Sequence, residues 1–195
     1  MKTYPDRQSA ITLLKKYNTD PFHIQHALTV SEVMRWFAKD LGYEEEEEFW
    51  ATVGLLHDVD FGQYPEEHLQ WAPKILAEVD ASDEFVRAVV SHGYGICSDV
   101  EPVHEMEKVL FATDELTGLI ASAALVRPSK SCQDMEYKSL NKKFKTRSFA
   151  AGCDRDIIQR GADQLGWTLQ ELMQKTLEAM KATEETIAEQ VKALV

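Results

Sequence analysis

A histidine and an aspartate lie side by side at the end of an apolar segment, at His57 and Asp58 in the sequence LLHDVD. Burying an imidazole and a carboxylate beside Leu55 and Leu56 costs free energy unless the two groups are paired or bind a metal ion. For an isolated dipeptide, a hydrogen-bonded pair at the end of a helix is the commoner explanation. The other histidines of the chain therefore decide between a structural pair and a metal site.

Further residues of the same types lie in or beside apolar segments, at His26, His68, His92 and Asp114. With His57 and Asp58 they supply four imidazoles and two carboxylates. This set suits one or two manganese, iron or zinc ions better than calcium or magnesium, which prefer oxygen ligands. Each histidine could instead be a separate core or capping residue. Six coincident placements favour a metal centre, of the kind that helical bundles build from inward side chains.

Apolar residues recur at spacings of three and four along most of the chain, which predicts amphipathic helices and no strands. We expect one domain over residues 1–195 with an all-α fold, a helical bundle. Asp20 and Pro21 should start the second helix, and Gly42 should end it. The expected helices cover residues 6–17, 21–42, 44–57, from about 65, 83–91, 106–126, 154–165 and from 168 to the end.

Composition excludes several functional classes. The formal net charge of −12 argues against nonspecific binding to nucleic acid or to an anionic membrane, because such binding depends on Lys and Arg. Three cysteines without paired spacing indicate a reducing compartment. The first 20 residues contain no uninterrupted apolar core, and no segment approaches 18 continuous apolar residues. These features predict a cytoplasmic protein that does not span a membrane.

One segment has the opposite charge to the rest of the chain. Between Arg127 and Arg147 there are seven Lys and Arg residues and only two acidic ones. Arg can bind a phosphate group through two hydrogen bonds, and Lys can neutralise its charge. A solvated basic loop is the alternative. The candidate substrate-binding residues are Arg127, Lys130, Lys142, Lys143 and Lys145.

The ordered set of His26 in HALTV, His57 and Asp58 in LLHDVD, and Asp114 in FATDELTGL resembles the HD-domain superfamily of metal-dependent phosphohydrolases. The resemblance covers about residues 20–125 and makes the remainder, about 126–195, a C-terminal helical extension. It implies one metal held by His26, His57, Asp58 and Asp114, with Asp58 bridging to a second metal. His68 and His92 resemble the two additional histidines of dinuclear members. Residues 112–160 also resemble a subgroup of predicted HD hydrolases.

The resemblance implies hydrolysis of a phosphate ester by a hydroxide held between metals about 3.5–4 Å apart. The basic segment predicts the class of substrate, a nucleotide or another small phosphorylated metabolite. Candidate catalytic residues are Asp58, as the bridging ligand, and Asp60 and Glu67, which could orient water or the histidines. Activity should fall in acid, because the ligands must be neutral imidazoles and ionised carboxylates. The alternatives are a di-iron oxygenase of the same fold and a ligand-binding module without catalysis.

The last predicted helix carries a long apolar stripe that includes Leu172, Leu177, Ile187 and Val191. Such a stripe usually packs in the core of the same molecule. It could also pack against a second copy of the chain, and a homodimer is therefore one expected assembly.

Overall fold

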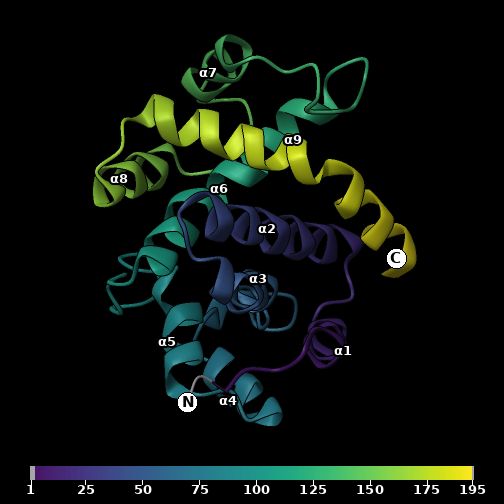
Figure 1. Ribbon diagram of the computed structural model, residues 1–195, viewed down its shortest axis with the longest axis vertical. Helices are drawn as coiled ribbons and strands as arrows, with labels where there is room; N and C mark the ends of the chain where they lie inside the picture. Colours follow the sequence, from purple (N-terminus) through teal and green to yellow (C-terminus); the bar gives the residue numbers. More distant parts are fainter. Residues whose placement is uncertain (1–2, 195) are drawn as a thin grey trace.

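A computed structural model describes residues 3–194, and within this range the protein consists of helices and connecting loops without a strand (Figure 1). The prediction of an all-α fold is confirmed. Three short 3₁₀ turns cover Glu44–Glu46, Pro65–Glu67 and Ala77–Val79. The α-helices are α1 (Arg7–Tyr17), α2 (Pro21–Asp40), α3 (Glu47–Leu56), α4 (Ala72–Leu76), α5 (Asp83–Ser91), α6 (Glu105–Leu125), α7 (Tyr137–Lys145), α8 (Arg155–Leu165) and α9 (Leu169–Leu194).

The predicted boundaries of α2 are confirmed at the level of individual contacts. The side chain of Asp20 accepts a hydrogen bond of 2.8 Å from the backbone N–H of Phe22, and Pro21 occupies the first helical position. Gly42, just beyond the end of the helix, has a φ angle of +82°, which glycine adopts without strain. These signals depend on neighbouring residues only, which is why they could be predicted from the sequence.

Two predictions about local structure were wrong. The helix expected from about Pro65 is only a 3₁₀ turn, and α4 begins at Ala72. His68 therefore lies in extended backbone, with φ −51° and ψ 135°, and Leu69 follows with φ 65°. The chain bends here because both carboxylate oxygens of Asp60 bind groups on the far side of the bend, His68 and Ala72.

The second error concerns the basic segment, which contains helix α7 although the sequence pattern predicts no helix between residues 126 and 154. Leu140 is fully buried, and Tyr137 and Phe144 pack against the same core. Their spacing of three and four residues is helical, but lysines between them obscure the pattern in the sequence. Lys142, Lys143 and Lys145 lie in the last turn, where positive charge interacts favourably with the helix dipole.

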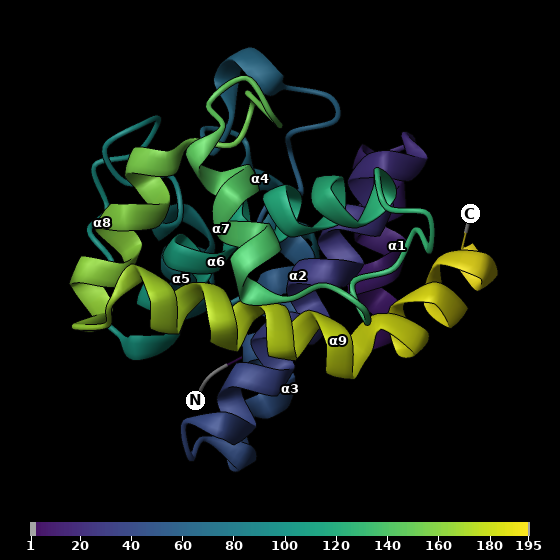
Figure 2. The same ribbon diagram turned by 90° about the horizontal axis from the view of Figure 1, so that it is seen from above.

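Helix α2 is central to the arrangement. Figure 1 shows α3 on one side of it and α9 on the other, with α7 packed on the outer side of α9. Viewed from above, α9 runs along one side of the whole bundle (Figure 2). The apolar stripe of α9, including Leu172, Met173, Leu177 and Ile187, is buried within this molecule. The C-terminal extension therefore covers the helices that carry the candidate site.

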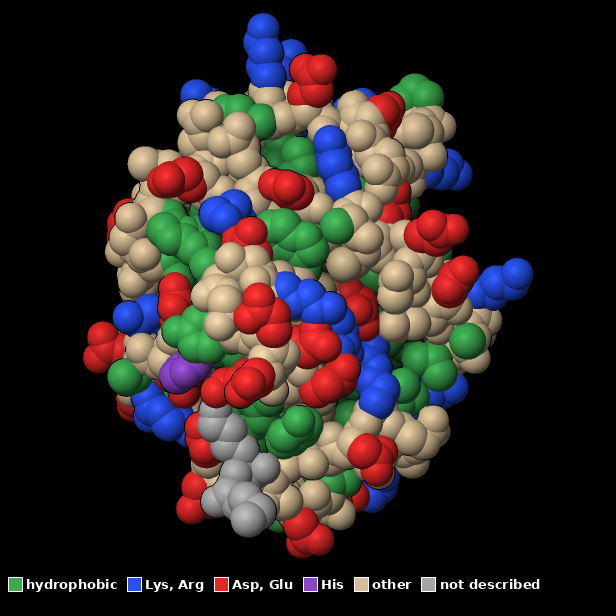
Figure 3. Space-filling view, viewed as in Figure 1, with side chains coloured by type: hydrophobic (Ala, Val, Ile, Leu, Met, Phe, Trp, Pro, Cys, Tyr) green, Lys and Arg blue, Asp and Glu red, His purple; other side chains and the backbone are tan. Residues whose placement is uncertain are grey.

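No helix within residues 3–194 combines the length and the apolar character needed to cross a membrane. Acidic and basic side chains are interspersed on the face drawn in Figure 3, and hydrophobic groups lie between them.

Candidate metal centre

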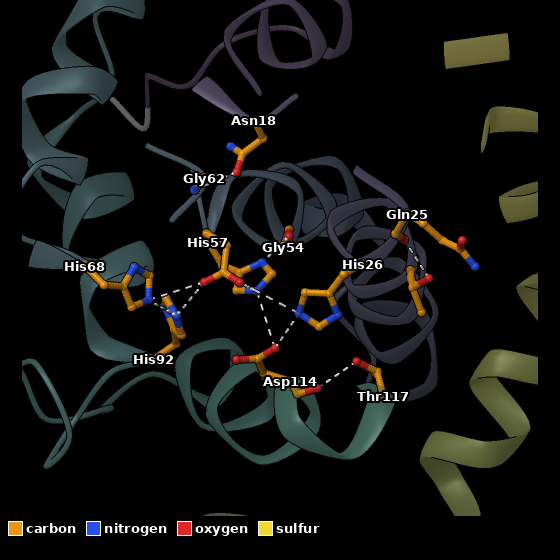
Figure 4. Close-up of polar contacts among 12 residues, drawn as sticks. Asn18, Gln25, His26, Gly54, His57, Gly62, His68, His92, Asp114 and Thr117 are labelled. Carbon is orange, nitrogen blue, oxygen red and sulfur yellow. Dashed lines mark hydrogen bonds and ion pairs between the residues drawn. The ribbon is translucent and has the colours of Figure 1, made fainter. Parts of the chain in front are cut away.

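Six side chains from different parts of the chain meet between α2, α3, α5 and α6 (Figure 4). His26 projects from α2, and Asp114 projects from the middle of α6. His57 and His92 each follow the last residue of their helix, α3 and α5. The remaining two are Asp58, directly after His57, and His68, after the turn Pro65–Glu67. The structure thus brings together all six metal ligands that the sequence predicts.

Asp58 lies between two groups of histidines. Its Oδ2 is 3.2 Å from Nε2 of His57 and 3.9 Å from Nε2 of His26. Its other oxygen, Oδ1, is 3.3 Å from Nε2 of both His68 and His92. One carboxylate therefore presents each oxygen to a different pair of imidazoles.

Asp114 completes the first of these groups. Its Oδ1 is 2.9 Å from Nε2 of His26 and 3.4 Å from Nε2 of His57. The ligand atoms of His26, His57 and Asp114 all lie within 4.8 Å of one another, and so do those of His57, Asp58 and His92. Both sets are close enough to share a metal ion.

Backbone and carboxylate acceptors hold three of the imidazoles with Nε2 directed at the centre. Nδ1 of His57 donates to the carbonyl of Gly54 at 2.8 Å, and Nδ1 of His92 donates to the carbonyl of Val89 at 2.6 Å. Nδ1 of His68 donates to Oδ1 of Asp60 at 2.8 Å. A neutral imidazole that donates from Nδ1 has a lone pair on Nε2. Each of these rings is therefore prepared as a metal ligand.

His57 provides the test of whether a metal fits. Its side chain is fully buried, and its Nε2 has no hydrogen-bond partner among the described residues. A buried polar atom without a partner costs free energy. In the neutral form of the imidazole, Nε2 carries a lone pair that faces two carboxylates, so a divalent cation between them would supply the missing interaction. The imidazole nitrogens and carboxylate oxygens present suit a metal ion such as manganese, iron or zinc.

Electrostatics favour a positive charge at the same position. Burial acts to lower the imidazole pKa of His57, but the carboxylates of Asp58 and Asp114 outweigh it and raise this pKa well above its ordinary value. Burial acts to raise the pKa of Asp58, but His57 and His92 bring that pKa well below its ordinary value. The pKa of Asp114 is lowered in the same way by His57 and His26. Both aspartates are therefore ionised at neutral pH.

Close packing of α3 against α2 places His57 beside His26. A Cβ atom added to Gly54 would lie 2.9 Å from Cγ of Met34 and 3.0 Å from the carbonyl oxygen of Val30. Both neighbours belong to α2, so glycine is what allows this approach. The ring centroids of His26 and His57 are 5.1 Å apart as a result.

Asp60 and Glu67, predicted as catalytic residues, occupy different environments. Asp60 is fully buried, and its carboxylate accepts hydrogen bonds from His68 and, at 2.9 Å, from the backbone N–H of Ala72. It therefore orients His68. Glu67 is exposed, and its Oε2 accepts a hydrogen bond of 2.9 Å from Nε1 of Trp71. A role for either carboxylate in the reaction itself stays a prediction.

The five predicted substrate-binding cations are dispersed. Arg127 donates to Oδ1 of Asp134 at 2.8 Å. Lys142 and Lys143 line a surface cavity of about 480 Å³ on α7, and Lys145 is exposed at the end of that helix. Lys130 is the member of the five that lines a cavity together with His26.

Two residues near the centre were missed in the sequence. Glu115 follows Asp114, and burial together with the charge of Asp114 raises its pKa to about 7. The guanidinium of Arg160 lies over the rings of Tyr94 and Phe111, 5.8 and 5.4 Å from their centroids. Tyr94 comes two residues after His92, and Phe111 comes three residues before Asp114. These contacts of Arg160 depend on the packing of α8 against α6, so the sequence pattern could not predict them.

Fold and site together define an all-α protein with a histidine–aspartate centre that could hold metal. The family model for the HD domain matches residues 23–119, which include all six residues of the centre. The chain therefore belongs to the HD-domain superfamily, whose members are generally metal-dependent phosphohydrolases. Comparison with curated proteins finds no match, and neither does comparison with solved structures.

Proposed function

We propose that this protein is a phosphohydrolase that cleaves a small phosphate ester at a dinuclear metal centre. The observation that carries the proposal is the position of Asp58. Its Oδ2 faces His57 and His26 while its Oδ1 faces His68 and His92. A carboxylate so placed can bridge two cations. Manganese, iron and zinc all suit the mixed nitrogen and oxygen ligands.

The chain supplies two ligand groups on either side of Asp58. His26, His57 and Asp114 would hold one metal, and His68 and His92 would hold the other. Metal ions at such a site activate water as a nucleophile and stabilise the attacking and leaving oxygens of the phosphoryl group. Hydrolysis forms a bond from the water oxygen to phosphorus and breaks the bond from phosphorus to the ester oxygen, which leaves as an alcohol with a proton.

The protein's own contribution is orientation, charge balance and binding. The hydrogen bonds at Nδ1 of His57, His68 and His92 hold these rings before any ligand arrives. Two aspartates balance only part of the charge of two divalent cations, so the centre would attract an anionic phosphate. Lys130, in the cavity that includes His26, is the cation that we assign to the substrate. Phosphate binding by Arg127, Lys142, Lys143 and Lys145 stays a prediction.

The test is metal content per chain, measured by elemental analysis of protein purified without oxygen or chelators and then supplied with manganese. We expect about two ions in the wild type and about one in His68→Ala, because His68 belongs to only one ligand group. His104→Asn is the matched control. The side chain of His104 caps α6 by accepting a hydrogen bond from the backbone N–H of Met106, and Asn caps helices well, so this variant should retain two ions.

Activity is tested on the same preparations with p-nitrophenyl phosphate and a set of nucleotides. Metal-dependent release of phosphate that is lost in Asp58→Asn would support the proposal. A single ion in both the wild type and His68→Ala would exclude the dinuclear centre. Consumption of dioxygen by the iron-loaded protein, without release of phosphate, would favour the oxygenase instead.

A further inference from the structure

A cavity of about 450 Å³ adjoins the metal centre on the side of His26, between α2, α6 and α9. Its volume lies in the range of small-molecule binding sites. Most of its lining is apolar, and two of the lining side chains, Phe22 and Leu125, are themselves more than half exposed, at 67% and 63%. The apolar lining includes Phe22, Ala121, Leu125, Met180, Ile187 and Val191.

His26 forms the boundary between this cavity and the centre. It lines the cavity, while its Nε2 lies 2.9 Å from Oδ1 of Asp114. Figure 4 shows His26 with His57 and Asp114 on one side and with Gln25 and Thr117 on the other, towards α9. A molecule that fills the cavity would therefore extend away from the metal ligands.

Three polar side chains of the cavity wall, Thr117, Thr29 and Glu184, are already engaged within the protein. The hydroxyl of Thr117 donates to the carbonyl of Asp114 at 2.7 Å, and the hydroxyl of Thr29 donates to that of Gln25 at 2.8 Å. Both carboxylate oxygens of Glu184 accept hydrogen bonds, from the hydroxyl of Ser131 and the backbone N–H of Cys132. Because most of the remaining lining is apolar, the cavity suits hydrocarbon.

Charge at the surface of the cavity complements an anion. Lys130 and Lys192 both line it, both are exposed, and neither forms an ion pair with a carboxylate among residues 3–194. An amphiphile with an apolar body and an anionic group matches these features together.

We propose that this cavity binds the apolar part of the substrate, which is a phosphate monoester of an alcohol with an extended hydrocarbon group. The assignment rests on the proposed function and specifies the class of its substrate. The phosphate lies at the centre beside His26, and the hydrocarbon lies between α2, α6 and α9. Its burial supplies binding free energy in proportion to the apolar area removed from water.

The first experiment measures binding of methylphosphonate, butylphosphonate and octylphosphonate to the full manganese-loaded chain by calorimetry. These compounds lack the ester bond and cannot be hydrolysed. We expect the affinity to rise about threefold to fourfold for each methylene group added, because each one transfers apolar surface out of water. Equal affinities for methylphosphonate and octylphosphonate would overturn the cavity assignment and leave the proposed function intact.

A matched pair of variants on α9 locates the binding. Ala188 and Ala182 are both exposed alanines of this helix, but only Ala188 lines the cavity. Ala188→Trp should fill the cavity and weaken octylphosphonate binding at least tenfold, while Ala182→Trp should bind it as the wild type does. Similar binding by both variants would place the hydrocarbon elsewhere.

Binding of 1-octanol to chelator-treated protein separates the two proposals, because this probe contains no phosphorus and needs no metal. If octanol binds to the wild type and Ala188→Trp abolishes this binding, the cavity assignment is supported. If in addition no phosphate ester is hydrolysed, only the proposed phosphohydrolase activity is overturned. A wild-type dimer that dissociates in Ala188→Trp, without binding of octanol or octylphosphonate, would show that a second copy of the chain covers this surface and would overturn the assignment.

Discussion

Asp60 shows how one buried carboxylate can decide the position of a candidate metal ligand, His68. It is fully buried, and it links the imidazole of His68 to the start of α4 through two hydrogen bonds. His68 comes only ten positions after Asp58, and the bend held by Asp60 turns His68 back toward the centre. A buried carboxylate with both oxygens occupied in this way determines the orientation of the ring it contacts.

At the residue scale we therefore predict that Asp60→Ala weakens metal binding by about 10- to 100-fold, the usual effect of removing the acceptor behind a histidine ligand. The measurement is calorimetric titration of metal-free protein with manganese. Glu66→Ala is the control, since Glu66 is an exposed carboxylate on the neighbouring 3₁₀ turn. Equal affinities in Asp60→Ala and the wild type would mean that His68 is oriented without Asp60 or is not a ligand.

At the scale of elements, the crossing of α2 and α3 sets the distance between His26 and His57. Gly54 lies at the contact, and its carbonyl accepts the hydrogen bond from Nδ1 of His57. The same residue thus controls the separation of the two helices and the tautomer of a ligand. Any side chain at this position must push α3 away from Met34 and Val30.

We expect Gly54→Ala to lower the free energy of unfolding by about 1–3 kcal/mol, because an added methyl group overpacks this contact. Metal affinity should fall with it, since His57 moves relative to His26. Thermal and urea denaturation measure the first effect, and manganese titration measures the second. At Gly152 a Cβ atom would meet nothing within 4 Å, so Gly152→Ala should change stability by no more than about 0.5 kcal/mol. If the two variants were equally stable, the close crossing would not restrain α3.

At the scale of the whole molecule, the centre joins elements that are distant in the chain. His26 is near the start, Asp114 is 88 residues later, and the helices that carry them are both covered by α9. A metal ion bound at this point would tie α2, α3, α5 and α6 together. A ligand that binds only the folded state raises the free energy of unfolding. At high ligand concentration, the increase is proportional to the logarithm of the ratio of free ligand concentration to dissociation constant.

Removal of metal should therefore lower the unfolding temperature. With free metal at about 1,000 times its dissociation constant, the stabilisation is about 4 kcal/mol. For a domain of this size, that corresponds to roughly 8–16 °C. Differential scanning calorimetry with and without a chelator measures the shift. Asp58→Asn should show little response to the chelator, and an unchanged melting temperature in the wild type would argue against a metal bound at this centre.

The sequence by itself determined most of the helices and the chemical types at the centre. The start and end of α2 depend on Asp20, Pro21 and Gly42, and local contacts of this kind act within one turn of chain. The order of His26, His57, Asp58 and Asp114 identified the HD domain because these residues stand in an apolar context that only pairing or metal binding would tolerate.

Only the tertiary structure decided which imidazoles each aspartate of the centre contacts. The division of Asp58 between two pairs of imidazoles depends on where α2, α3 and α5 cross, and no spacing along the chain encodes a crossing. The bend at His68 depends on contacts with Asp60, and helix α7 depends on contacts with the core beneath Leu140, so neither was predicted from the sequence. The cavity beside His26 exists because α9 returns across α2 and α6 from the far end of the chain. Each of these features depends on packing between segments that are distant in the chain, which local sequence patterns do not encode.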